Sequence, residues 1–158
     1  CGLRRAEVCD LKVKQVSLKN KSAKIIGKGN KERTIYFPEA VLDVLKTWLN
    51  FRQLNKDGID AGFVFGRIDN KQCLHLEIPL DPSSVTRIIE KLVVETENLE
   101  GRLTPHDLRR TFATRLISKN VDIVEVHKLM GHASVATTGN YIRKDEENLR
   151  KAAEKAEL

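Results

Sequence analysis

Apolar and polar positions in the first forty residues follow a short helical pattern and then a strand pattern. Apolar side chains at helical spacing between residues 4 and 11 predict a short helix. The next apolar stretches are separated by turns of hairpin length that are rich in Lys, Asn and Gly. These stretches, residues 13–18, 23–26 and 34–37, predict a small three-stranded antiparallel sheet that Pro38 ends.

The rest of the chain has mostly helical periodicity. Apolar positions recur every three or four residues from residue 39 to about residue 54, which predicts an amphipathic helix with Trp48 in the core. Residues 66–82 contain enough Gly, Asn and Pro to be predicted as mostly loop. Ser83 or Ser84 is then expected to cap a helix whose apolar face is Val85, Ile88, Ile89, Leu92 and Val93. Further helices are predicted from Pro105, Ile123, Val135 and Asp145.

The predicted fold class is therefore mainly α, with a small three-stranded antiparallel sheet near the N-terminus. At 158 residues, the chain has the length of a single domain, residues 1–158, that folds without disulfides or metal. Its three cysteines form no CxxC pair, so neither a disulfide framework nor a zinc knuckle is predicted. Because the sequence lacks an initiator Met and any long apolar run, we expect a fragment of a cytosolic protein.

Positive charge is concentrated in two separate blocks of the sequence. The formal net charge is +6. Residues 1–37 hold 10 basic and 3 acidic side chains, and residues 102–144 hold 8 and 3, whereas the residues between them are acidic overall. If the fold joins the two blocks, they form a face suited to a phosphate backbone. A solvated, lysine-rich surface is the alternative interpretation.

A phosphate-binding position is predicted at the start of the helix that begins at Pro105. Thr104 offers an N-cap hydroxyl, and Asp107 can return the capping bond. The N–H groups of the first turn and the helix dipole favour an anion at this point. His106 and Arg109 stand three residues apart on one side of the helix, so both can reach one anion.

Arg109 also falls within the apolar face of this helix. On a helical wheel it lies between Leu116 and Ala113, whereas Arg110 lies outside that face. A partly desolvated arginine is costly unless an anion or a carboxylate pairs with it. Arg109 is therefore a candidate phosphate ligand, and a structural salt bridge to an internal acid is the alternative.

Five short motifs occur in the order found in tyrosine recombinases of the phage integrase type. Residues 2–7 resemble the G-L-R-x-x-E segment of that family, and residues 27–33 resemble its hairpin G-K-G-x-K-x-R. Residues 106–109 match H-x-L-R, residues 129–132 match L-x-G-H, and Tyr141 follows His132 by nine residues. Each motif alone is weak, but together they span residues 2–141, so almost the whole chain resembles the catalytic domain of this family.

The resemblance implies a mainly α catalytic domain that cleaves and rejoins duplex DNA through a covalent phosphotyrosine. It places these residues around the scissile phosphate, with Tyr141 as the nucleophile: Arg4, Lys28, His106, Arg109 and His132. Neither metal nor ATP is needed for such chemistry, and the sequence contains neither HExxH nor a Walker A pattern. The family also has a further helix and a core-binding domain before G-L-R, which this sequence does not include.

These residue types suit strand transfer to a tyrosine. Two guanidiniums, Arg4 and Arg109, can hold the nonbridging oxygens through bidentate bonds that a lysine would not reproduce. Lys28 is the expected general acid for the leaving 5′ oxygen, and nearby cations favour the ionised form of Tyr141. His106 is a candidate base or phosphate donor, and His132 a donor to a nonbridging oxygen.

Each of these interpretations has an alternative. The alternative for Tyr141 is a residue that only packs in the fold. The alternatives for Lys28 and Arg4 are an ordinary turn lysine and a surface cation. For the whole chain, a type IB topoisomerase shares the chemistry, and a catalytically silent DNA-binding module would keep the basic face. A metal-dependent nuclease is a third possibility.

The C-terminal segment, residues 145–158, carries a narrow apolar stripe of Leu149, Ala152, Ala153 and Ala156. A helix so short is marginal alone and is expected to dock on another surface. Related recombinases pass this segment to a neighbouring protomer, so the resemblance implies a homo-oligomer, a tetramer, on double-stranded DNA. No membrane partner is expected, and the implied location is the cytoplasm, either associated with a bacterial nucleoid or as a phage-encoded protein.

Overall fold

The structure is a computed structural model that describes residues 1–27, 30, 32–54, 62–96 and 103–131. Its N-terminal part begins with the short helix α1 (Arg5–Cys9) and a single 3-10 turn η1 (Val13–Gln15). The antiparallel sheet that follows has the order β1 (Val16–Ser17), β2 (Ser22–Ile26), β3 (Glu32–Tyr36). The predicted three-stranded sheet is therefore confirmed.

The first predicted strand, residues 13–18, was wrong in its extent, because only Val16 and Ser17 pair with β2. The side chain of Gln15 accepts a hydrogen bond of 2.7 Å from the backbone N–H of Lys12. The backbone N–H of Gln15 in turn donates to the carbonyl of Lys12 at 3.0 Å, which closes the 3-10 turn. Such side-chain bonds to the backbone compete with strand pairing. The turn shortens β1 to two residues.

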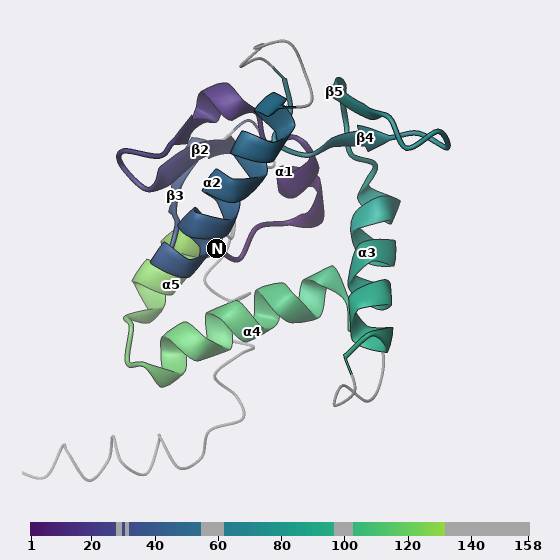
Figure 1. The fold of residues 1–158 in the computed structure, drawn as a ribbon. Helices are drawn as coiled ribbons and strands as arrows, with labels where there is room; N and C mark the ends of the chain where they lie inside the picture. Colours follow the sequence, from purple (N-terminus) through teal and green to yellow (C-terminus); the bar gives the residue numbers. More distant parts are fainter. Residues whose placement is uncertain (28–29, 31, 55–61, 97–102, 132–158) are drawn as a thin grey trace, which may run out of the picture.

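The apolar spacing correctly predicted the long helix α2 (Glu39–Leu54). This helix lies across one face of the sheet (Figure 1). The α2 residues Leu42, Leu45 and Leu49, which recur every three or four positions, are buried in one core with residues of the sheet and with Val64. The core residues of this layer are Leu11, Ala23, Ile25, Ile35, Phe37, Leu42, Leu45, Leu49 and Val64. Trp48 packs at the edge of this core and donates from its ring N–H to the carbonyl of Val64 at 2.8 Å.

Residues 66–82 are not mostly loop, which corrects the sequence prediction. They form an antiparallel pair of strands, β4 (Gly66–Ile68) and β5 (Leu74–Pro79). The carboxylate of Asp69 accepts from the backbone N–H groups of Lys71 at 2.8 Å and Cys73 at 2.9 Å. Of the residues that suggested a loop, Asn70 lies at the tip of this hairpin, whereas Gly66 and Pro79 lie within its strands.

The two helices α4 (Pro105–Ser118) and α5 (Ile123–Met130) begin where the sequence predicted them. They pack on one another through a second small core of Ala113, Val126 and Met130, with Phe112 and Leu116 at its edge. Helix α5 also contacts β3, so this helix bridges α4 and the sheet. The helices predicted from Val135 and Asp145 lie outside the described residues.

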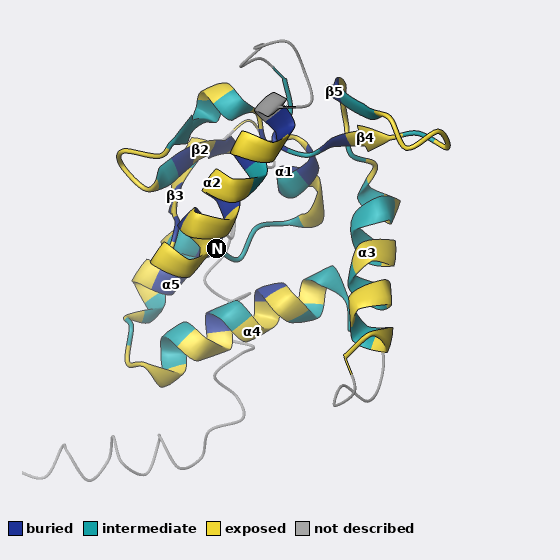
Figure 2. Cartoon of the chain, in the orientation of Figure 1, coloured by how far each residue is buried: buried dark blue, intermediate teal, exposed yellow. Residues whose placement is uncertain are grey.

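Helix α3 (Pro82–Val94) is capped by Asp81, not by Ser83 or Ser84 as the sequence predicted. The Asp81 carboxylate accepts from the backbone N–H of Ser83 at 2.7 Å, which starts the helix at Pro82, earlier than expected. No residue of α3 is buried, and Ile88 and Leu92 are 50% and 56% exposed. In Figure 2, α3 is coloured as exposed or intermediate, whereas buried residues in dark blue lie between α2 and the sheet.

An apolar groove of about 790 Å³ runs beside α3. Its walls come from the N-terminal segment, α2, α3 and α4, and include Trp48, Val85, Ile89 and Phe112. Within the described residues, no helix is both long and apolar enough to cross a membrane.

Candidate active site

The start of α4 has the predicted capping geometry. The Thr104 hydroxyl accepts from the backbone N–H of Asp107 at 3.2 Å, and the Asp107 carboxylate accepts from the backbone N–H of Thr104 at 2.9 Å. The hydrogen bonds from the Thr104 hydroxyl and backbone hold the pKa of Asp107 below its ordinary value, because they stabilise the ionised carboxylate. His106 is exposed in this first turn.

Arg109 lies one turn further along α4 and is only 6% exposed, as its place in the apolar face predicted. Its guanidinium donates to the carbonyl oxygens of Gly2 and Met130. The N-terminal segment, α4 and the end of α5 therefore meet at this side chain. These carbonyl partners are part of what compensates the buried charge.

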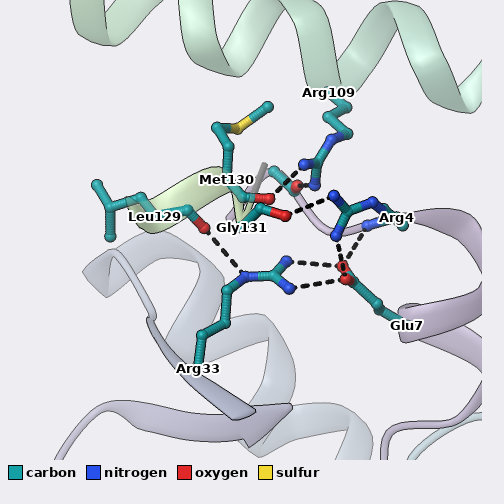
Figure 3. A network of polar contacts seen from close by, with 8 residues as sticks. Arg4, Glu7, Arg33, Arg109, Leu129, Met130 and Gly131 are labelled. Atoms are coloured by element: carbon teal, nitrogen blue, oxygen red, sulfur yellow. Dashed lines mark hydrogen bonds and ion pairs between the residues drawn. The ribbon is translucent and has the colours of Figure 1, made fainter. Parts of the chain in front are cut away.

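Arg4 reaches the same place from the N-terminal segment. Its guanidinium donates to the carbonyl of Gly131 at 2.6 Å and to the carboxylate of Glu7 at 2.8 Å. Met130 and Gly131 are chain neighbours, with Cα atoms about 3.8 Å apart. The guanidiniums of Arg4 and Arg109 thus converge on adjacent carbonyls, although they lie more than a hundred positions apart in the sequence (Figure 3).

Glu7 and Arg33 complete this cluster, and neither was singled out from the sequence. Arg33 donates through both terminal nitrogens to the two carboxylate oxygens of Glu7, each at 2.7 Å. Its Nε donates to the carbonyl of Leu129 at 3.2 Å. Both residues stand in the matched motifs, but they belong to different elements, so their spacing gave no sign that they pair.

The carboxylate of Glu7 accepts four hydrogen bonds, which is about the capacity of an ionised carboxylate. Two come from Arg33, and two come from the backbone N–H and the side chain of Arg4. Burial opposes ionisation here, but the bonds from Arg33 and Arg4 outweigh it and lower the pKa of Glu7 to about 2. Glu7 is therefore a buried anion between two arginines.

Three arginines from three segments bind three consecutive carbonyls at the end of α5. Arg33 on β3 binds Leu129, Arg109 on α4 binds Met130, and Arg4 binds Gly131. The last carbonyls of a helix lack intrahelical donors and carry its partial negative charge, so they suit these cations. Two of these guanidiniums, those of Arg4 and Arg33, also bind the carboxylate of Glu7.

The structure brings together two of the six predicted site residues, Arg4 and Arg109, and places His106 on the exposed first turn of the same helix as Arg109. Lys28, His132 and Tyr141 lie outside the described residues. Among the residues that are described, no group of three or more His, Cys, Asp and Glu side chains is placed to hold a metal ion.

Residues 1–148 match the phage integrase family. This chain belongs to that family. It is 35% identical over 159 residues to the tyrosine recombinase XerA of Pyrococcus furiosus, a match that covers 99% of this chain and 51% of the relative. It is 32% identical over 149 residues to the tyrosine recombinase XerC of Alcanivorax borkumensis, covering 94% of this chain and 46% of the relative.

Solved structures of this family have the same fold. The crystal structure of the XerA recombinase matches with a TM-score of 0.78 and 30% identity, covering 99% of this chain and 54% of that one. A complex of the XerH site-specific recombinase with a palindromic difH substrate matches with a TM-score of 0.71 and 29% identity, covering 96% and 41%. The predicted fold class is confirmed, and the chain spans about half the length of the curated relatives it matches.

Proposed function

We propose that residues 1–158 form one catalytic domain of a site-specific DNA recombinase or integrase. It cleaves and rejoins DNA strands through a covalent 3′-phosphotyrosine at Tyr141, without metal or ATP. The observation that carries this proposal is the convergence of Arg4 and Arg109 on the adjacent carbonyls of Met130 and Gly131. Family membership and the recombinases among the relatives support it.

The two arginines are proposed to hold the nonbridging oxygens of the scissile phosphate. Strand transfer adds negative charge to these oxygens in the transition state, and fixed guanidinium donors stabilise that charge. The Arg4 side chain is 35% exposed. Its described contacts occupy two of the five guanidinium N–H donors, so others can face a phosphate.

The remaining assignments rest on the motifs. Tyr141 is proposed to attack the phosphorus atom, and the bond to the 5′ oxygen breaks as Lys28 donates a proton to that oxygen. The bond energy is retained in the phosphotyrosine, so the reverse attack by a 5′ hydroxyl rejoins the strand. His106 and His132 are proposed to bind the phosphate or to move the tyrosine proton, and the exposure of His106 is compatible with contact to DNA.

The proposed partner is double-stranded DNA. The XerH structure that this chain resembles is bound to a DNA substrate, and the basic blocks of the sequence meet at the arginine cluster. We further propose a tetramer on DNA, assembled through residues 145–158, and action in the cytoplasm. Both rest on the resemblance to recombinases.

The test is the formation of a covalent protein–DNA complex. The protein is first used to select a binding site from a randomised duplex pool, and that site is then offered as a nicked suicide substrate in the presence of EDTA. We expect a band of reduced mobility in a denaturing gel, lost in Tyr141→Phe. Tyr36→Phe is the matched control, because Tyr36 lies on β3 and is 62% exposed.

The other outcomes separate the alternatives. Binding of DNA with no covalent band in the wild-type protein indicates a silent DNA-binding module. Relaxation of supercoiled plasmid without any preferred site indicates a type IB topoisomerase. Cleavage that EDTA abolishes indicates a metal-dependent nuclease.

A further inference from the structure

Arg33 contacts both of the groups that hold the guanidinium of Arg4. One is the carboxylate of Glu7, which Arg33 binds through two parallel hydrogen bonds of 2.7 Å. The other is Gly131, where a β carbon would lie 2.8 Å from three atoms of the Arg33 side chain. Arg33 therefore packs directly on the residue whose carbonyl accepts from Arg4.

The burial of these side chains differs in a way that separates their roles. The Arg33 and Glu7 side chains are 11% and 5% exposed, whereas the Arg4 side chain is 35% exposed. Arg4 can therefore present donors to a substrate at the surface. Arg33 is more deeply buried than Arg4, and its described donors are directed to Glu7 and to the carbonyl of Leu129.

We propose that Arg33 is a positioning residue for DNA cleavage, which acts by holding Glu7 and the Leu129–Gly131 turn so that Arg4 faces the scissile phosphate. This inference rests on the proposed function. Arg33 touches neither DNA nor the reacting atoms. It fixes the two acceptors that set the direction of the Arg4 guanidinium.

Loss of Arg33 has a specific consequence for Arg4. The Glu7 carboxylate would keep its place in a buried site but lose two of its four hydrogen bonds. A buried carboxylate with too few partners is costly, so the remaining cation, Arg4, is drawn toward it. The Arg4 guanidinium then moves away from Gly131 and from the phosphate.

A lysine at position 33 cannot restore this arrangement. A single ammonium group is a compact point charge, whereas Arg33 uses three nitrogens in a planar fork toward two different segments. The Arg33→Lys variant would restore the charge near Glu7 but not the contact with the Leu129 carbonyl. Removal of the carboxylate charge, in contrast, removes the force that displaces Arg4.

The experiment measures single-turnover cleavage of the nicked suicide duplex at saturating DNA. It compares wild type with Arg33→Met, Arg33→Lys and the double variant Glu7→Gln/Arg33→Met. We expect Arg33→Met to cleave roughly 10- to 100-fold more slowly at similar DNA affinity, with partial activity in Arg33→Lys. The double variant should cleave roughly fivefold or more faster than Arg33→Met, because the displaced Arg4 is released.

Arg67→Met is the matched control, since Arg67 is an exposed strand arginine on β4 and its loss removes the same charge. It should cleave at the wild-type rate at saturating DNA. Thermal unfolding and the concentration of active sites are measured for every variant, so that the rate refers to folded protein.

Three results overturn the inference. Arg33→Met could cleave at the wild-type rate, or the double variant could be as slow as Arg33→Met or slower. The first result means that Arg33 serves stability alone, and the second means that Arg33 does not act on Arg4 through the charge of Glu7. Absence of a covalent band from the wild-type protein overturns the proposed function and this inference with it. This outcome is distinguishable from the other two because it is seen in the wild-type protein, before any Arg33 variant is compared.

Discussion

The guanidinium of Arg33 lies against the α carbon of Gly131, which stands directly after α5 in the left-handed conformation with φ of +59°. A β carbon at this position would lie 2.8 Å from Cδ, Cζ and Nε of Arg33. Gly131 is thus required both for its backbone conformation and for the space that Arg33 fills. This contact explains why the L-x-G-H motif has a glycine at this position.

Gly131→Ala tests that reason. Asn120→Ala is the control, because Asn120 has a φ of +60° and an exposed side chain. The control should lose about 1 kcal/mol of unfolding free energy, from the left-handed backbone alone. Gly131→Ala should lose about 1–3 kcal/mol more, because Arg33 must move. Urea denaturation measures both, and equal losses would show that the contact with Arg33 contributes nothing.

The ionisation of Glu7 makes stability depend on acid pH. The pKa of Glu7 falls from an ordinary value of 4.5 to about 2 in the folded protein. The unfolded chain therefore takes up the proton first as the pH falls. The stabilisation is complete above pH 4.5 and is lost progressively between about pH 4.5 and pH 2.

The expected loss over that range is about 2–3 kcal/mol more in wild type than in Glu7→Gln, measured by urea denaturation at a series of pH values. Glu39→Gln is the control, because Glu39 is an exposed carboxylate paired with Lys21. Its pH dependence should follow that of wild type. Parallel curves for wild type and Glu7→Gln would refute the assignment of this acid sensitivity to Glu7.

The capping box of α4 should support both stability and the position of His106. Thr104→Ala removes the hydroxyl that accepts from the Asp107 N–H, and should cost about 1 kcal/mol of unfolding free energy. Thr114→Ala on the same helix is the control, because the Thr114 hydroxyl only bonds back to the carbonyl of Arg110 at 3.1 Å. It should be neutral or slightly stabilising. A loss in Thr114→Ala equal to that in Thr104→Ala would argue against a capping role.

Arg109→Lys should be nearly as damaging as a full truncation of the side chain. The guanidinium spans the carbonyls of Gly2 and Met130, and an ammonium group cannot hold both and also face a phosphate. We expect cleavage to fall by roughly 100-fold or more. Arg110→Lys, which changes the exposed neighbour on α4, should retain the wild-type rate. A wild-type rate for Arg109→Lys would mean that positive charge alone suffices at this position.

Local sequence signals predicted the parts of the fold that depend on local interactions. The apolar spacing of α2 and the Thr104–Asp107 cap of α4 needed only residues within a few positions of one another. The hairpin at Asp69 and the cap at Asp81 were missed because an acidic side chain in each takes backbone N–H groups, and composition alone does not show which polar residue will do so.

For the site, the helical wheel correctly indicated that Arg109 is desolvated. The pairing of Arg33 with Glu7 was beyond such reasoning, since it depends on how β3 and α1 meet in three dimensions. The convergence of Arg4 and Arg109 followed from the resemblance and not from periodicity. The predicted roles of all six site residues stay predictions: Arg4, Lys28, His106, Arg109, His132 and Tyr141.

The central claim is that Arg4 and Arg109 act on one and the same phosphodiester. The most direct measurement replaces a single phosphate of the suicide duplex, at the position mapped by the covalent complex, with a neutral methylphosphonate. Since the neutral group needs less charge compensation, the cleavage defects of Arg4→Ala and Arg109→Ala should both shrink at this position and at no other. Defects that stay unchanged there, or that shrink at two different phosphates for the two arginines, would contradict the account.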